Sequence, residues 1–338
     1  MTATSPKDAQ PTTVRLQNIA QSYGQSAALM AAVEIGLFTA IAKGATTFDT
    51  IATALDIHPV NAERLTVMLC AAGLVERRDG RLVNAPDVER FLVQGSPSYM
   101  GPWITFTKPQ WNEWGRLAEH MRTKELRLIG AIGDFTVEDA QRYHDATYSI
   151  GLGAGRRFVR QVDLSQRHKI MDIGGGSGAY CIAAAKAHAH IKGVVLDLAP
   201  VCVVANKFLA ANGVGDRVVA TPCDFTRDPF PRDCDVAIMA SNLPMYGRDM
   251  IQAVVSKAFD ALVPGGQMHL IGETTNDDRT GPWGPAYWGL GQAVVDSQGL
   301  AHSESDVTGY FATAGFRDIK LEPFIEGSLS RIVGTKAG

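Results

Sequence analysis

The sequence predicts an α/β protein of two domains, in which a mainly α N-terminal module precedes a doubly wound parallel sheet. From Lys169 onward, short apolar runs typical of strands alternate with helix-like segments, which favours a parallel sheet covered on both faces. Upstream, two helix-like segments lead into two strand-like runs around Asp79-Gly80, a dipeptide favoured in tight hairpins. That order is typical of a winged helix. The length of 338 residues leaves room for two domains.

We expect four segments along the chain. Residues 1–14 are polar and rich in Thr and Pro, and we expect them to form a disordered head. Residues 15–100 form the winged-helix domain, and residues 101–165 form an aromatic-rich helical linker that lines the substrate pocket. Residues 166–338 form the sheet domain, and its last two strand-like runs add a hairpin at the sheet edge.

Charge and composition exclude several classes of partner. The chain has 32 basic and 35 acidic side chains, a formal charge of −3, so it has no general basic field for nucleic acid. No stretch approaches the ~20 apolar residues that span a bilayer, and the start lacks the apolar segment of a signal peptide. We therefore expect a cytoplasmic protein with no nucleic-acid, membrane or metal partner. The cysteines are odd in number, lack metal-site spacing and suit a reducing compartment: Cys70, Cys181, Cys202, Cys223 and Cys234.

The winged-helix module leaves two roles open. In a DNA-binding role, the helix-like run 62–72 would enter a major groove and the chain would be a ligand-sensing regulator. Few basic residues support this role, and neighbouring acids offset them. The apolar stripe of residues 26–42 favours dimerisation instead, because so much apolar surface must be covered.

A glycine-rich turn between a strand and a helix carries the strongest chemical signal. It runs from Asp172 to Gly178 and lets the backbone turn sharply and approach a ligand closely. About 20 residues further on, Asp197 ends the next strand-like run, where a carboxylate can meet ribose hydroxyls. Asp172 would repel a phosphate but attract a sulfonium and an α-amino group. The turn therefore favours S-adenosylmethionine (SAM) over a dinucleotide.

Other strand ends complete the expected cofactor site. Asp224 can accept from an adenine amino group, and the ring of Phe225 can pack on the base. The residues expected to bind SAM are Asp172, Gly174, Gly175, Gly176, Gly178, Asp197, Leu198, Asp224, Phe225, Ala240 and Ser241.

The runs DIGGGSGAY, VVLDLAPV, CDFTRDPFP, DVAIMASNLP and ALVPGGQMHLIGE resemble the SAM-dependent small-molecule O-methyltransferase family. This resemblance covers the chain from about Leu16 to Lys336. It implies a Rossmann-like class I methyltransferase fold and a homodimer formed through the winged-helix dimerisation domain. It also implies that the glycine loop holds the methionine part of SAM, that Asp197 binds ribose and that residues 224–225 meet adenine.

The chain departs from this family where a base is expected. Hydroxyl-methylating members usually carry a His-Asp-Trp run after the fourth strand, and here Pro244 falls at the His position. Proline cannot accept a proton. Of the two carboxylates that usually flank the base, Glu273 matches one, and Ala301 falls at the other.

The missing base favours an acceptor with no proton to lose, such as a thioether sulfur. The chain is also similar to bacterial S-methyltransferases that act on 4-methylthio-2-hydroxybutyrate in dimethylsulfoniopropionate synthesis. Methylation at oxygen or carbon of an aromatic or keto acid remains the alternative. Aromatic rings can stabilise a sulfonium and polar groups can hold a carboxylate, so the expected acceptor-binding residues are Trp114, Arg142, Tyr143, His144, Tyr148, Arg156, Trp288 and Gln292.

Overall fold

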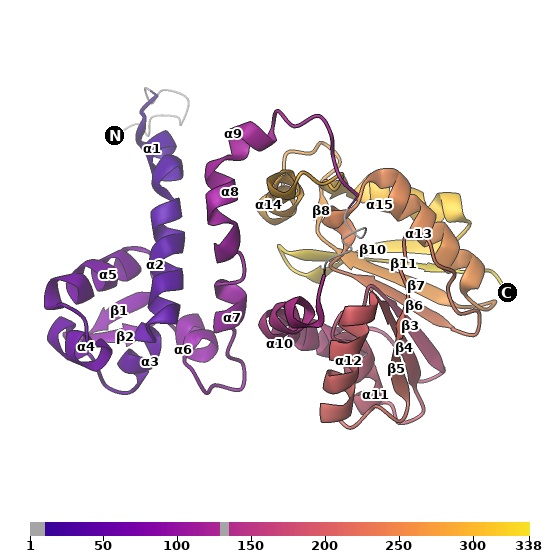
Figure 1. The fold of residues 1–338 in the computed structure, drawn as a ribbon, viewed down its shortest axis with the longest axis horizontal. Coiled ribbons are helices and arrows are strands. Elements are labelled where there is room, and N and C mark those ends of the chain that lie inside the picture. Colours follow the sequence, from indigo (N-terminus) through magenta and orange to yellow (C-terminus); the bar gives the residue numbers. More distant parts are fainter. Residues whose placement is uncertain (1–10, 129–134) are drawn as a thin grey trace, which may run out of the picture. The chain divides into compact units, whose positions relative to one another are not determined.

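The computed structural model describes residues 11–128 and 135–338, in two compact units that divide between Lys108 and Pro109 (Figure 1). Residues 1–10 of the expected head lie outside the described residues, and the first helix begins at Val14. No helix in the described ranges is both long and apolar enough to cross a membrane.

The first unit is mainly helical and contains one antiparallel hairpin. Asp79 and Gly80 form its turn with φ of 48° and 77°, as the two central residues of a tight hairpin turn require. Its apolar core joins the helices to the hairpin through Phe38, Leu69 and Leu82. The elements are α1 (Val14–Gln21), α2 (Tyr23–Glu34), α3 (Leu37–Ala42), α4 (Phe48–Leu55), α5 (Pro59–Ala71), β1 (Val75–Arg78), β2 (Arg81–Asn84), α6 (Pro86–Leu92) and α7 (Gly101–Ile104).

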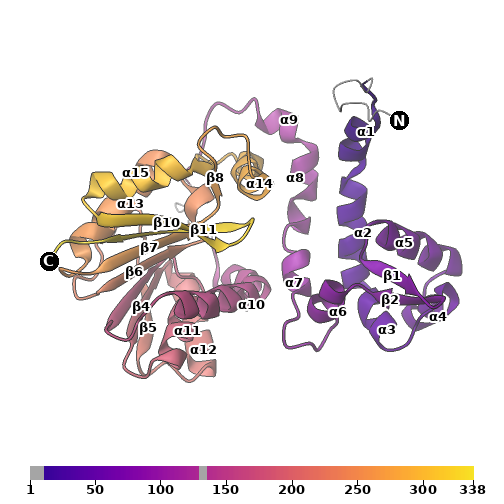
Figure 2. The same cartoon turned by 180° about the vertical axis from the view of Figure 1, so that it is seen from behind.

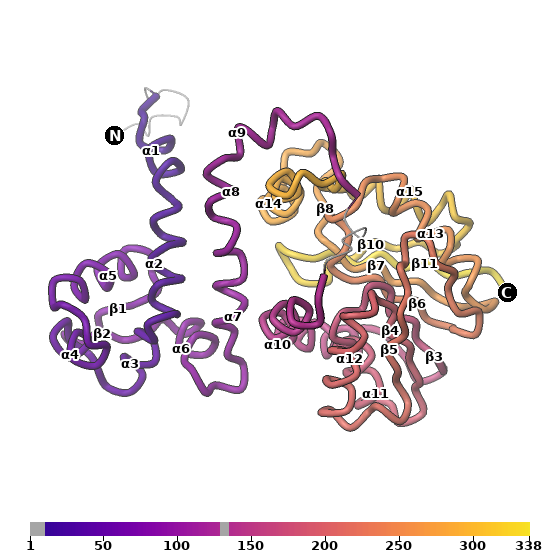
Figure 3. The backbone as a smooth tube through the Cα atoms, viewed as in Figure 1, coloured from indigo at the N-terminus to yellow at the C-terminus, as the bar shows by residue number. Residues whose placement is uncertain are grey.

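The second unit is built on a seven-stranded sheet with the order β10-β11-β7-β6-β3-β4-β5. The five strands from β7 to β5 are parallel, and β11 and β10 add the expected antiparallel hairpin at the edge (Figure 3). The strands are β3 (Lys169–Ile173), β4 (Lys192–Asp197), β5 (Val218–Pro222), β6 (Val236–Ala240), β7 (Gln267–Gly272), β10 (Arg317–Ile325) and β11 (Leu329–Thr335), with β8 (Thr274–Thr275) and β9 (His302–Ser303) paired separately.

Helices cover both faces of this sheet (Figures 1 and 2). On β3, Met171 packs with α13 and α15, whereas Ile170 packs with α10 and α11, because successive side chains point to opposite faces. The helical elements are η1 (Lys108–Gln110), α8 (Trp111–Gly115), α9 (Leu117–His120), α10 (Val137–Gln161), α11 (Ala179–Ala187), α12 (Ala199–Ala211), η2 (Leu243–Met245), α13 (Arg248–Ala261), α14 (Trp283–Gly291), η3 (Ala293–Val295) and α15 (Glu304–Ala314). The carboxyl ends of the parallel strands share one edge, where ligands bind in sheets of this kind.

Candidate active site

The glycine loop between β3 and α11 is held in a conformation that only glycine adopts easily. Gly174, Gly176 and Gly178 have φ of 62°, 56° and 74°. The backbone amide of Gly174 donates to the carbonyl of Leu196, and that of Gly176 donates to a carboxylate oxygen of Asp197 at 2.9 Å. The loop is therefore tied to the end of β4.

Side chains of the protein approach the same loop closely. A β-carbon added to Gly174 would lie 2.7 Å from Nδ2 of Asn242, and one added to Gly176 would lie 2.6 Å from Cε1 of His144. One added to Gly175 would lie 2.5 Å from Cγ of Asp172. The glycines are thus needed for packing within the protein, in addition to any approach to a ligand.

Asp197 is arranged to accept further hydrogen bonds. Its Oδ2 accepts from Gly176 and its Oδ1 accepts from the amide of Leu198 at 2.7 Å, which leaves lone pairs on both oxygens. Burial raises the pKa of this carboxyl, and the two backbone hydrogen bonds offset part of that rise. This geometry suits the pair of ribose hydroxyls expected here.

Asp172 is a buried carboxylate without a hydrogen bond of normal geometry on either oxygen within the described residues. Burial, and then the charge of Asp197, raises its pKa to about 7, although the nearby Cys181 offsets part of this rise. A buried, uncompensated carboxylate is costly unless a cation meets it. SAM carries an ammonium and a sulfonium, so the residues present fit this donor.

Residues that follow β5 and β6 also lie near the glycine loop. Phe225 is buried and lies close to Gly174. The carboxylate of Asp224 accepts from the amide and hydroxyl of Thr226 and from Arg227, so local contacts occupy much of its capacity. Ser241, exposed after β6, has φ of 60°, a strained conformation of the kind found at functional sites.

Two positioning residues were not predicted from the sequence. Nδ2 of Asn242 donates to the carbonyl of Gly174 at 3.2 Å and to that of Ala240 at 3.1 Å, and so joins β3 to β6. Nζ of Lys257 donates to the carbonyls of Phe225 and Asp228. Only the position of Asn242 directly after a strand-like run could have indicated its role.

The residue at the position expected for a base is a proline, which cannot accept a proton. Pro244 is buried in η2, where its carbonyl would lie 2.3 Å from a β-carbon added to Gly299. Ala301 is packed against α14, since a β-carbon added to Gly289 would lie 2.6 Å from that of Ala301. Glu273 directly follows β7, and its Oε2 is buried without a hydrogen-bond partner among the described residues.

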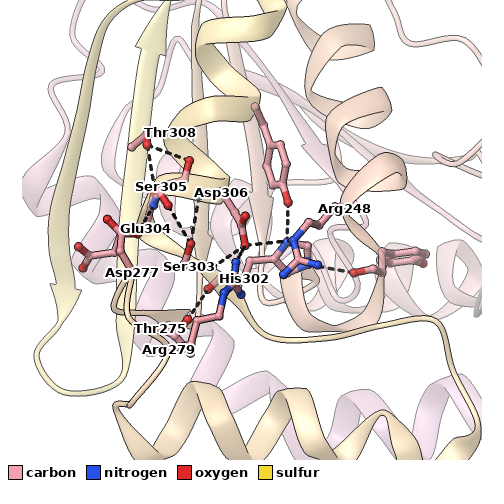
Figure 4. A network of polar contacts seen from close by, with 12 residues as sticks. Arg248, Thr275, Asp277, Arg279, His302, Ser303, Glu304, Ser305, Asp306 and Thr308 are labelled. Carbon is pink, nitrogen blue, oxygen red and sulfur yellow. Dashed lines mark hydrogen bonds and ion pairs between the residues drawn. The ribbon is translucent and has the colours of Figure 1, made fainter.

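His302 and His144 lie on elements near this position, and neither is suited to replace that base. His302 is buried, with Nδ1 2.8 Å from the hydroxyl of Tyr310 and Nε2 2.9 Å from the carbonyl of Tyr246, so both ring nitrogens are occupied. Figure 4 shows His302 within the polar network that includes Asp306. His144 lies at the glycine loop, but burial lowers its pKa to about 4, which makes it a weak base near pH 7.

The expected acceptor residues on α10 separate into two groups. His144 packs against the glycine loop. Tyr143 is 42% exposed, and desolvation by its neighbours, followed by the charges of Asp197 and Glu273, raises the pKa of its phenol. Arg142 is exposed and pairs with Asp139 at the start of the helix. Arg156 is also exposed. The expected carboxylate-binding role of these arginines finds no support in this geometry.

The side chain of Tyr148 packs between two helices. Its ring stacks on Phe208 with centroids 4.3 Å apart, and its hydroxyl accepts from Asn212 at 2.7 Å. Both partners lie on or directly after α12. Tyr148 therefore joins α10 to α12, and its expected contact with the acceptor stays a prediction.

The remaining expected residues lie around α14. Trp114 stacks on Tyr287 with centroids 5.3 Å apart, and Trp283 stacks on the same ring at 5.0 Å. Trp288 is partly buried beside Tyr287, and the Gln292 side chain accepts from Ser297. These aromatic residues form one cluster.

Comparison with known proteins identifies the family. A model of the O-methyltransferase domain matches residues 131–317, more than half of the chain, and a model of the O-methyltransferase dimerisation domain matches residues 17–94. This chain belongs to the O-methyltransferase family. The expected α/β fold, the SAM-dependent methyltransferase activity and the use of SAM are confirmed by this membership. The dimerisation domain supports the expected homodimer.

Relatives of this chain match almost its whole length. It is 29% identical over 331 residues to 3-hydroxy-5-methyl-1-naphthoate 3-O-methyltransferase of Streptomyces sahachiroi, covering 95% of each chain. It is 27% identical to the tetracenomycin polyketide synthesis 8-O-methyl transferase of Streptomyces glaucescens, covering 93% and 94%. Human N-acetylserotonin methyltransferase, solved in complex with SAM, has the same fold with a TM-score of 0.81, 21% identity and coverage of 98% and 99%. The two Streptomyces relatives are named as methyltransferases that act at oxygen.

Proposed function

We propose that this O-methyltransferase family member transfers the methyl group of SAM to the sulfur of a small thioether hydroxy acid such as 4-methylthio-2-hydroxybutyrate. The observation that carries the proposal is Pro244, which stands where a proton-accepting histidine is expected. A thioether sulfur attacks through a lone pair and loses no proton, so it does not need that base. Its product would belong to dimethylsulfoniopropionate synthesis.

SAM is consumed in the reaction and supplies an electrophilic methyl carbon. Asp197 is suited to fix the ribose, Asp172 to meet a positive charge of the donor, and Phe225 to pack beside the base. Alignment of donor and acceptor about 3–3.5 Å apart, away from water, can supply much of the acceleration without proton transfer.

Methylation at a hydroxyl oxygen is the second candidate, and the names of the relatives favour it. One feature of the site also favours it, because the unpartnered Oε2 of Glu273 is able to accept a proton. In this case the acceptor would be a hydroxylated aromatic or keto acid.

One acceptor separates the two candidates, since 4-methylthio-2-hydroxybutyrate carries both a thioether and a hydroxyl. The purified chain is incubated with SAM that carries a deuterated methyl group, and the product is fragmented by mass spectrometry. We expect a fixed cation that loses labelled dimethyl sulfide. Label retained on an ether, or turnover of hydroxylated aromatic acids alone, would exclude the sulfur proposal.

A further inference from the structure

Glu273 occupies an unusual electrostatic position at the carboxyl edge of the sheet. The residue directly follows β7, and side-chain alternation places it on the face that carries His269 and Ile271, the face covered by α10 and α11. Its Oε2 is buried and has no hydrogen-bond partner within the described residues. Burial raises the pKa of this carboxyl.

The surroundings of Glu273 contain further acids and phenols. Desolvation raises the pKa of Tyr143 and of Tyr180. The charge of Asp197 adds to the rise for Tyr143, that of Asp172 adds to the rise for Tyr180, and that of Glu273 adds to both. The hydroxyl of Tyr180 is buried and, within the described ranges, also lacks a hydrogen-bond partner. The charges that raise the pKa values of these phenols are those of Asp172, Asp197 and Glu273. The site therefore gathers three carboxylates.

An unpaired buried carboxylate destabilises a fold unless a ligand satisfies it, so it indicates a place where a positive charge is expected. Asp172 and Asp197 border the glycine loop and the donor. Glu273 follows a different strand, next to η2, which contains Pro244. The charge of Glu273 also acts on Tyr143, one of the residues expected to bind the acceptor.

We infer that Glu273 is a catalytic residue whose carboxylate stabilises the positive charge that develops on the acceptor sulfur. This inference rests on the proposed function. A lone pair of the thioether sulfur forms a bond to the methyl carbon, and the bond between that carbon and the donor sulfur breaks with its electron pair remaining on the donor. One positive charge moves from donor to acceptor, and no proton is released.

Fixed charges aimed at a developing charge act strongly in a site with little water, and removing one such group typically slows a reaction by about 10²–10³-fold. Glu273→Gln keeps the shape of the side chain and removes its charge. We expect kcat for the thioether acceptor to fall by about 100-fold, while the affinity for SAM changes little. Glu273→Asp keeps the charge and is expected to retain more activity than Glu273→Gln.

Binding provides a readout that does not depend on turnover. Calorimetry compares the neutral 4-methylthio-2-hydroxybutyrate with its S-methylated, cationic product, both in the presence of S-adenosylhomocysteine. The unsubstituted protein is expected to prefer the cation, and Glu273→Gln is expected to lose this preference. Glu326→Gln, a neutralised exposed glutamate at the β10–β11 turn, is the matched control and should behave as the unsubstituted protein.

The outcomes separate this inference from the proposed function. An unsubstituted enzyme that makes only an ether product defeats both. An enzyme that makes the sulfonium, while Glu273→Gln keeps kcat within about threefold and keeps the preference for the cation, defeats this inference alone. Thermal unfolding of each variant shows whether a loss reflects the site or the fold, and Glu273→Asp decides the question if Glu273→Gln does not fold.

Discussion

The imidazole of His144 lies against the backbone of Gly176, the glycine whose amide donates to Asp197. A residue of α10 therefore supports the loop that is expected to hold the methionine part of SAM. This contact links the helix that precedes the sheet to the end of β4, through a position that has no room for a β-carbon.

Gly176→Ala is expected to weaken SAM binding by at least tenfold. The added carbon would meet His144 at 2.6 Å and would also occupy a left-handed conformation with φ of 56°. Gly213→Ala is the matched control, since Gly213 has φ of 69° but no atom within 4 Å of an added carbon. That control should lose about 1–2 kcal/mol of stability and keep its SAM affinity. Equal SAM affinities of the two variants, measured by calorimetry, would show that the contact with His144 is unimportant.

Asp197→Asn is expected to raise the Kd for SAM by about 10- to 100-fold, because hydrogen bonds to a charged group contribute about 1.5–3 kcal/mol. The amide nitrogen of the new side chain would also face a backbone donor, either Gly176 or Leu198. Asp216→Asn changes an exposed carboxylate and should leave binding unaltered. An unchanged Kd for Asp197→Asn would remove this residue from the donor site.

Tyr148→Phe is expected to lower stability by about 1 kcal/mol without changing the KM for the acceptor. The substitution removes the hydrogen bond from Asn212 and keeps the ring that stacks on Phe208. Thermal unfolding and steady-state kinetics check the two parts. A several-fold rise in the KM for the acceptor with no loss of stability would instead show that Tyr148 contacts the acceptor.

His120 is expected to stabilise the second unit in a pH-dependent manner. Its Nδ1 lies 3.1 Å from Asp296 and its Nε2 lies 3.0 Å from Glu113, and these hydrogen bonds raise the pKa of His120 above 6.5. The stabilisation that the charged imidazole contributes is complete below pH 6.5, and it is lost as the pH rises through the raised pKa of His120. The hydrogen bond with His120 also lowers the pKa of Asp296. The stabilisation that the charged carboxylate of Asp296 contributes is therefore present above pH 3.8, and it is lost as the pH falls through the lowered pKa.

The unfolding temperature of His120→Gln should therefore fall furthest below that of the unsubstituted protein near pH 5–6, and the gap should narrow toward pH 9. His190→Gln, the same change at an exposed histidine, serves as the control and should show no such trend. A gap that is constant across this range would mean that the charge of His120 contributes nothing.

The parallel sheet was predictable because buried strands such as Lys169–Ile173 and Lys192–Asp197 are short apolar runs, each followed by a helix. The edge hairpin and the Asp79-Gly80 turn were predictable from local chemistry as well. These features depend on residues close together in the sequence, so the pattern alone determines them.

The site was predictable only in part. Positions at strand ends, such as Asp197, follow from topology, whereas the faces of the long helix α10 do not. Tyr148 and Arg142 both suit an acceptor by residue type, but which face of the helix meets the site depends on how α10 packs on α11 and α12. The pairing of Arg142 with Asp139, three residues earlier, was the one local sign that it faces solvent.

Proton release during turnover tests most directly whether the acceptor attacks without losing a proton. A weakly buffered reaction with a pH indicator is followed while the S-adenosylhomocysteine formed is quantified. Transfer to a thioether sulfur releases no proton, so the account predicts an unchanged indicator signal as product accumulates. Release of one proton for each S-adenosylhomocysteine would contradict it and indicate an acceptor that loses a proton, at a hydroxyl or at a carbon.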